Sequence, residues 1–224
     1  MFPLDTLLTY LVAALVVVIS PGPDNILAIS RGLSQGRTAA CLSSLGAGLG
    51  IMVHTLAATL GLSLVIQTSP LAFWAVKIVG AVYLVWLGVK ALRSRDLIRF
   101  DDADENRQGA SGGSPRRSQP MPLRQVLLTG WLSNVLNPKP GLFVLAFLPQ
   151  FVSASRGDVA TQMLVYGALF AVLTTVIFAL LGSSAARLSS WLSRHPRVGT
   201  GLNVGAGLTF VAAGASVLTL RARV

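Results

Sequence analysis

Six long apolar segments constrain the fold of this chain more than any other feature of its sequence. A helix needs roughly 20 predominantly apolar residues to cross a bilayer. A soluble domain carries about 25% charged residues, whereas only 12% of this chain is charged. The sequence therefore predicts an all-α integral membrane protein with six transmembrane helices, in contact with membrane lipid. We place these helices at about residues 5–31, 39–66, 71–93, 123–151, 160–184 and 199–220.

Residues 94–121 lie between the third and fourth predicted helices and differ from both in composition. They carry an acidic cluster at 101–105, several arginines and hardly any apolar side chain. Such a segment cannot bury enough apolar surface to offset the entropy cost of folding. We expect a disordered linker here. It divides the chain into a first three-helix repeat at 1–93 and a second at 122–224.

Lysine and arginine are distributed unequally between the two sides of the predicted bundle. Thirteen of them lie in or beside the first, third and fifth loops, and three lie on the opposite side. Because cytoplasmic loops carry an excess of basic residues, we expect the linker in the cytoplasm and both termini outside. The net charge of +10 comes largely from these short loops, so the sequence predicts no nucleic-acid partner.

The two halves of the chain share a pattern of glycines and prolines. Each half has three predicted spans, an odd number, so the second repeat must cross the membrane inverted relative to the first. Inverted repeats with interrupted helices in equivalent positions are typical of secondary transporters. The matching pairs, 121 or 126 residues apart, are Gly36 and Gly157, Gly46 and Gly167, Gly61 and Gly182, Pro70 and Pro196, and Gly88 and Gly214.

The first predicted helix is broken at Ser20-Pro21-Gly22-Pro23-Asp24. Irregular backbone at bilayer depth is tolerated only where it is buried in protein or lines a cavity. Gly22 or Ser20 can cap the second half-helix, and Pro23 suits its first turn. Asp24 has two interpretations. It complements the positive end of the helix dipole, or it meets a substrate ammonium or carries a proton, as ionisable groups inside membranes often do.

The fourth predicted helix is broken at Asn137-Pro138-Lys139-Pro140. If Asn137 caps the following half-helix and Pro138 opens it, Lys139 lies in the first turn, where its charge opposes the helix dipole. A cation in this position needs a partner. The candidates are Asp24, across the pseudo-twofold axis, and an anionic group on a ligand.

Together the two breaks suggest a site for a small zwitterion such as an amino acid. Its carboxylate would face Lys139 and the half-helix amino ends, and its ammonium would face Asp24 and unwound carbonyls. Asn134 lies about one turn before Lys139 and is expected to line the same cavity. His54 either relays protons or forms a neutral hydrogen bond between helices.

Glycines at 46–50 and 201–207 favour close helix packing, within the chain or in a homodimer. The two histidines, His54 and His195, are far apart in the sequence and have no nearby set of ligands, so we expect no metal site. The sequence also contains no evident nucleophile or paired-acid set. We therefore expect the protein not to be an enzyme.

At these residues the chain resembles the LysE/RhtB family of amino-acid exporters of the bacterial inner membrane. This resemblance implies export of an amino acid or a derivative, driven by the proton gradient in an antiport, without a cofactor. A passive channel, or an exporter of another small metabolite, is the alternative. Pro140 departs from the family, where a small or aliphatic residue is usual. The matching motifs are Ser20 to Asp24, Ser34 to Arg37, Gly80 to Gly88, Asn137 to Lys139 and Phe147 to Phe151.

Overall fold

The computed structural model describes residues 2–20, 22–68, 121–185 and 187 of the 224-residue chain, without the side chains of 62–68. Sixteen further positions are described singly or in pairs between 78 and 93 and between 201 and 215. The predictions for Pro21, His195, the linker up to residue 120 and most of the third and sixth helices therefore lie outside the described residues.

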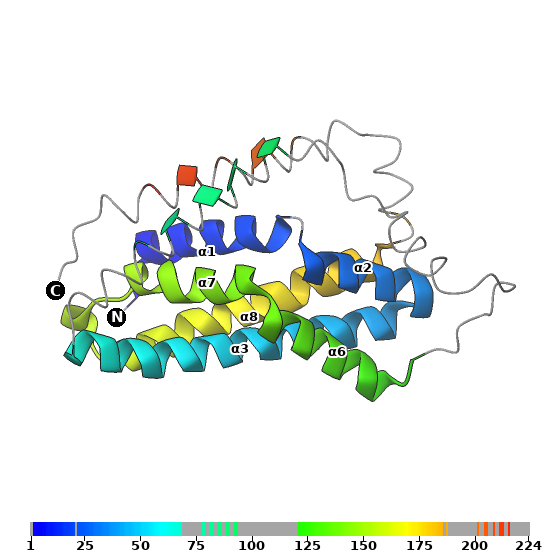
Figure 1. The fold of residues 1–224 in the computed structure, drawn as a ribbon, viewed down its shortest axis with the longest axis horizontal. Helices are drawn as coiled ribbons and strands as arrows, with labels where there is room; N and C mark the ends of the chain where they lie inside the picture. The colour runs from blue at the N-terminus through cyan, green and yellow to red at the C-terminus, as the bar shows by residue number, and fades with distance from the viewer. Residues whose placement is uncertain are drawn as a thin grey trace, which may run out of the picture.

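The described part of the chain forms helices that run side by side in an elongated bundle (Figure 1). It contains no strand, which confirms the prediction of an all-helical protein. The elements are α1 (Leu4–Ile19), α2 (Pro23–Gln35), α3 (Arg37–Thr68), α6 (Leu123–Leu136), α7 (Pro138–Ala146) and α8 (Val159–Ser183), with short 3-10 turns η1 (Leu148–Phe151) and η2 (Ala154–Arg156) before α8.

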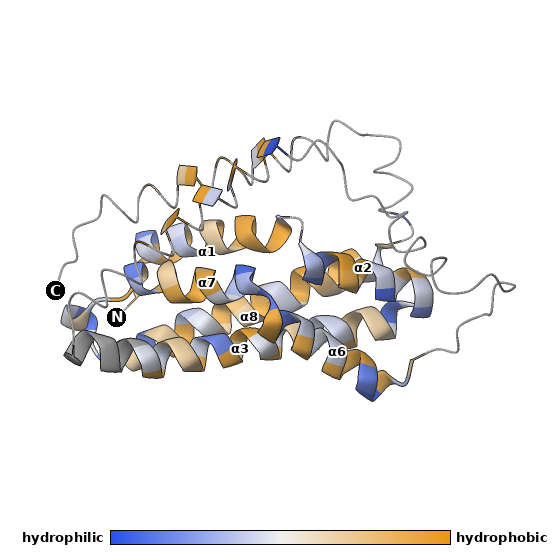
Figure 2. Ribbon diagram, viewed as in Figure 1, coloured by the Kyte–Doolittle hydropathy of each residue, from blue (hydrophilic) through white to orange (hydrophobic). Residues whose placement is uncertain are grey.

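Two of these helices are long and apolar enough to cross a membrane by themselves. They are the segment Arg37–Gly61 of α3 and the whole of α8. The pair α1 and α2 passes the same test when taken as one span, although the two helices are bent by 61° at their junction. Apolar residues occur along every labelled helix (Figure 2), and several of them are exposed; Leu60 is 73% exposed and Val172 is 62% exposed. These exposed side chains suit contact with lipid.

Small residues let α3 approach its neighbours closely. A Cβ added to Gly46 would lie 2.7 Å from the backbone nitrogen of Trp131 in α6, and one added to Gly50 would lie 2.7 Å from the side chain of Asn134. Gly48 is similarly close to Thr175 of α8. The glycines at 46–50 therefore pack within the chain, as small residues do between membrane helices. A homodimer through Gly-rich helix faces stays a prediction.

An aromatic cluster fills the bundle where α1, α7, η1 and α8 meet. The hydroxyl of Tyr10 donates to the carbonyl oxygen of Tyr166 at 2.7 Å, and the two rings lie 4.7 Å apart. The cluster continues through Phe143, Phe151 and Phe170. Close aromatic packing of this kind makes one end of the bundle interior dense and dry.

Candidate functional site

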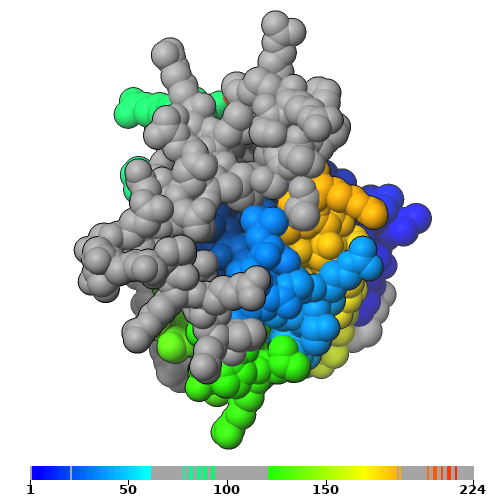
Figure 3. Space-filling view, turned by 90° about the vertical axis from the view of Figure 1, so that its right-hand side faces the viewer, coloured from blue at the N-terminus to red at the C-terminus, as the bar shows by residue number. Residues whose placement is uncertain are grey.

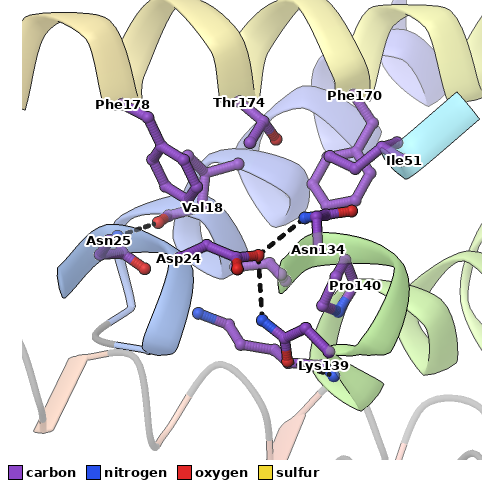
Figure 4. Close-up of a pocket in the computed structure, with 12 residues that line it drawn as sticks. Val18, Asp24, Asn25, Ile51, Asn134, Lys139, Pro140, Phe170, Thr174 and Phe178 are labelled. Atoms are coloured by element: carbon purple, nitrogen blue, oxygen red, sulfur yellow. Dashed lines mark hydrogen bonds between the residues drawn. The ribbon is translucent and has the colours of Figure 1, made fainter. Parts of the chain in front are cut away.

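A cavity lies in the middle of the bundle, where the α1–α2 junction faces the α6–α7 junction (Figure 4). It contains about 280 Å³ of empty space, counting the part that is open to solvent. The part that can hold water-sized molecules is about 20 Å³, which is room for about one water molecule. The lining residues are Val17, Val18, Asp24, Asn25, Ile51, Asn134, Asn137, Lys139, Pro140, Phe170, Thr174 and Phe178.

The first junction separates α1 from α2. The helix α1 ends at Ile19, and α2 begins at Pro23 with the extended residue Gly22 as its N-cap. Two carbonyls near the end of α1 have side-chain donors. Asn25 Nδ2 donates to the carbonyl oxygen of Val18 at 2.8 Å. The carbonyl oxygen of Ser20 accepts from Lys139, in the other half of the chain. These two freed carbonyls are thus satisfied inside the protein, as a membrane interior requires.

The second junction separates α6 from α7. The helix α6 ends at Leu136, and Asn137 is the N-cap of α7, with Pro138 as the first helical residue. The Oδ1 of Asn137 accepts from the backbone nitrogen of Lys139 at 3.0 Å. This is the local arrangement expected from the sequence, because Asn favours the cap position and Pro the first turn.

Asp24 is fixed by three donors from the second junction. Its carboxylate accepts from Ser133 Oγ at 2.8 Å, from Asn134 Nδ2 at 2.7 Å and from Asn137 Nδ2 at 3.0 Å. The side chain is only 6% exposed. Asp24 therefore joins the start of α2 to the second junction through three side-chain hydrogen bonds.

Lys139 reaches in the opposite direction, toward the end of α1. Its Nζ donates to the carbonyl oxygen of Ser20 at 2.5 Å. Gly22 leaves room for this side chain, because a Cβ there would lie 3.3 Å from Nζ. Within the described residues, no hydrogen bond or ion pair joins Lys139 to Asp24 directly. The two opposite charges therefore share one cavity while each is held by neutral groups.

The two charged residues occupy equivalent places in their helices. Asp24 is the second residue of α2 and Lys139 is the second residue of α7, each after a proline. Asp24 contacts the end of α6, and Lys139 contacts the end of α1. The two contacts are therefore reciprocal. Each charge lies at the amino end of its own helix and contacts the carboxyl end of a helix from the opposite junction.

The remaining residues predicted for the site lie at its edge. His54 Nε2 lies 3.0 Å from the carbonyl oxygen of Asn134, which joins α3 to the end of α6, and His54 is not among the cavity-lining residues. Gly22, Pro23 and Pro138 also lie outside the lining set; Pro23 and Pro138 are exposed. These three residues shape the junctions.

Several lining or supporting residues were missed by the sequence reasoning. Ser133 and Asn25 are neighbours of residues that were singled out, and their polarity beside Asn134 and Asp24 was an available signal. The contribution of α8 had a weaker signal. Its lining residues recur every four positions, which places them on one helix face, but nothing local distinguishes that face from ordinary core. They are Phe170, Thr174 and Phe178.

This architecture defines a multi-pass membrane protein with a charged cavity between its helices. Residues 15–221 match the family model described as LysE type translocator, and the chain belongs to that family of transporters. The resemblance seen in the sequence motifs is thereby confirmed.

Relatives of similar length cover most of the chain. An uncharacterized membrane protein of Bacillus subtilis (strain 168) is 33% identical over 80% of this chain and 82% of its own. The leucine efflux protein of Enterobacter sp. (strain 638) is 29% identical over 95% and 94%. The homoserine/homoserine lactone efflux protein of Salmonella typhimurium is 27% identical over 95% of each chain. No solved structure matches this chain.

Proposed function

We propose that this protein exports a small amino acid, or a derivative of one, across the bacterial inner membrane in exchange for protons. One observation carries the proposal: Asp24 and Lys139 bring opposite charges into a single cavity without neutralising each other by direct contact. A zwitterion presents the complementary pair of charges. The printed names of two relatives, which refer to efflux of leucine and of homoserine, support the same class of substrate.

The binding pose follows from the donors and acceptors of the cavity. The substrate carboxylate replaces the carbonyl of Ser20 as the partner of Lys139, close to the amino end of α7, where the helix dipole favours an anion. The substrate ammonium faces Asp24 from the cavity side. The cavity as it stands has about 20 Å³ for water-sized molecules, room for about one water, so the bundle must open to admit the substrate.

We further propose that the chain is an inverted repeat in which α1 with α2, and α6 with α7, each form one interrupted span. The equivalent positions of Asp24 and Lys139 support this interpretation. So do Gly36 and Gly157, a pair matched in the sequence. Among the described residues these two glycines alone have positive φ, 84° and 125°, and they come just before α3 and α8.

Transport by alternating access is supported by dense packing on both sides of the cavity. On one side lies the aromatic cluster around Tyr10. On the other, a Cβ on Gly182 of α8 would lie 2.6 Å from the carbonyl oxygen of Ala28 in α2 and 2.7 Å from Cβ of Ala40 in α3. Figure 3 views that end of the bundle and shows the surface of α3 between those of α6 and α8. Opening either side alone would expose the cavity to one compartment.

The direction of export follows from the proposed orientation. The excess of basic residues in the odd-numbered loops supports a cytoplasmic linker and a cytoplasmic end for the α2, α6 and α8 side of the bundle.

We assign the coupling proton to Asp24. Its protonation would remove the charge that holds Ser133, Asn134 and Asn137 in place, and would thereby loosen the contact between the two junctions.

The test is efflux of radiolabelled amino acids from vesicles that contain the purified protein. Lys139→Met should abolish efflux, because methionine keeps the apolar stem and removes the charge. Arg124→Met is the matched control, since Arg124 is exposed at the start of α6, and it should transport normally. Unchanged efflux in Lys139→Met would refute the role of Lys139. Efflux that is insensitive to dissipating the proton gradient would favour a passive channel.

A further inference from the structure

The hydroxyl of Thr174 is a buried polar group that lacks a partner in the described residues. The side chain is 2% exposed, and its Oγ1 has no hydrogen bond. Thr55 and Thr59 of α3 behave differently: each donates to the carbonyl four residues earlier, at 2.9 and 2.8 Å. Such back-bonding is the usual way to satisfy a threonine within a helix. Thr174 does not use it, so its hydroxyl is left available.

The position of Thr174 directs this hydroxyl at the transport site. Phe170, Thr174 and Phe178 lie four residues apart on one face of α8, and all three line the cavity. In Figure 4 the threonine projects from α8 between the two aromatic rings, toward the side where Asp24 and Asn134 lie. The wall opposite the charged groups is therefore apolar, with one hydroxyl at its centre.

A second unpartnered group lines the same cavity. Asn134 is 1% exposed, and its Nδ2 is committed to Asp24, which fixes the orientation of the amide. Its Oδ1 has no donor. A threonine hydroxyl can donate or accept, and an amide oxygen can only accept. Buried polar groups left without a partner destabilise a protein, and in native structures each one calls for a specific explanation.

We propose that Thr174 hydrogen-bonds to the side chain of the transported molecule, and that this molecule is a neutral amino acid with a short, hydroxyl-bearing side chain. This inference rests on the proposed function, in which Asp24 and Lys139 take the ammonium and the carboxylate. Those two residues are the only ionisable groups among the twelve that line the cavity. The wall that meets the substrate side chain thus carries no charge. Its two phenyl rings limit the length of that side chain, and its one hydroxyl lacks a hydrogen-bond partner within the described residues.

The experiment uses threonine and valine, which differ only by a hydroxyl in place of a methyl group. Efflux of each is measured from vesicles that contain the wild-type protein or Thr174→Val, which makes the same exchange on the protein. The wild type should prefer threonine over valine by at least roughly tenfold, since a site that hydrogen-bonds a substrate hydroxyl rejects the analogue that lacks it. In Thr174→Val most of that preference should disappear while valine efflux is retained or increased.

Thr175→Val is the matched control. Thr175 is the next residue of α8, but its hydroxyl donates to the carbonyl oxygen of Ser44 at 3.4 Å and it does not line the cavity. It should leave the preference for threonine unchanged. The melting temperature of Thr174→Val should equal or exceed that of the wild type, because no hydrogen bond is lost. A clear drop would indicate a structural role and would contradict the proposal.

The other outcomes are equally decisive. A wild-type protein that exports valine as well as threonine, or neither of them while it exports other amino acids, overturns the assignment of the substrate class. A preference for threonine that persists in Thr174→Val overturns the role of this residue. A wild-type protein that exports no amino acid at all refutes the proposed function itself, and this inference with it.

Discussion

The two helix junctions have similar sequences and hold their charges in different ways. Each has a proline followed by a charged residue at the start of the second helix. Asp24 is bound by three side chains of the opposite junction, whereas Lys139 is bound by a single backbone carbonyl, that of Ser20. The α7 helix also has a side-chain cap from Asn137, whereas the N-cap of α2 is Gly22, which provides no side-chain hydrogen bond.

This difference suggests that the two charged residues have different roles in transport. Releasing Lys139 from Ser20 loses one hydrogen bond, and in the proposed binding pose a substrate carboxylate replaces it. Moving Asp24 loses three hydrogen bonds and leaves three donors unpaired, of which Asn134 and Asn137 are buried, so it costs more. We interpret Asp24 as the group that joins the two halves of the chain until it takes up the coupling proton, and Lys139 as the group that exchanges Ser20 for the substrate.

The largest effect on stability is expected for Asp24→Ala. The change leaves the donors of Ser133, Asn134 and Asn137 without their shared acceptor, and we expect a loss of about 3 kcal/mol. Ser133→Ala, which removes only one of these bonds, should lose about 1 kcal/mol. Thermal unfolding in detergent measures both. If the melting temperature of Asp24→Ala equals that of the wild type, Asp24 does not join the two halves.

Replacing the N-cap residue should destabilise the protein more at α7 than at α2. Asn137→Ala removes the cap of α7 and one donor to Asp24, and should lose about 2 kcal/mol. Gly22→Ala at the start of α2 removes no side-chain bond and should lose less than about 1 kcal/mol. The extended backbone of Gly22, with φ of −171°, accepts alanine. Equal losses measured by thermal unfolding would show that the cap is not what distinguishes the junctions.

Gly36 and Gly157 test whether the two halves share their geometry. Alanine is strained at positive φ, so Gly36→Ala and Gly157→Ala should each lose about 1 kcal/mol in thermal unfolding. Gly61 is the control, because it lies within α3 with nothing within 4 Å of an added Cβ. Gly61→Ala should be neutral or slightly stabilising. Clearly unequal losses at Gly36 and Gly157 would weaken the proposed repeat.

The smallest effect on stability is expected for Lys139→Met, although its effect on transport is the largest. Only the bond to Ser20 is lost, and burial of an ammonium group is relieved, so the net change should stay within about 1 kcal/mol. Melting temperature and vesicle efflux, measured on one preparation, separate the two properties. A loss as large as that of Asp24→Ala would make Lys139 a structural residue and remove the contrast between the junctions.

Local features of the sequence were sufficient to predict the helical membrane fold and the residues at the junctions. Apolar length, proline and the preference of Asn for a cap act over a few residues, so their effects are readable along the chain. The bounds of α3 and α8 lie within a few residues of the predicted spans. The third and sixth helices, the linker and the orientation stay predictions.

The partners of the charged residues were decided by tertiary structure. The sequence left open whether Lys139 pairs with Asp24 or with a ligand. Asp24 bonds residues 109 to 113 positions away, and Lys139 bonds Ser20 across 119 positions. Thr174 acquires its significance only because α8 packs over both junctions. Contacts at such separations depend on how whole helices pack, and the short-range preferences that fix a helix or a cap carry no information about them.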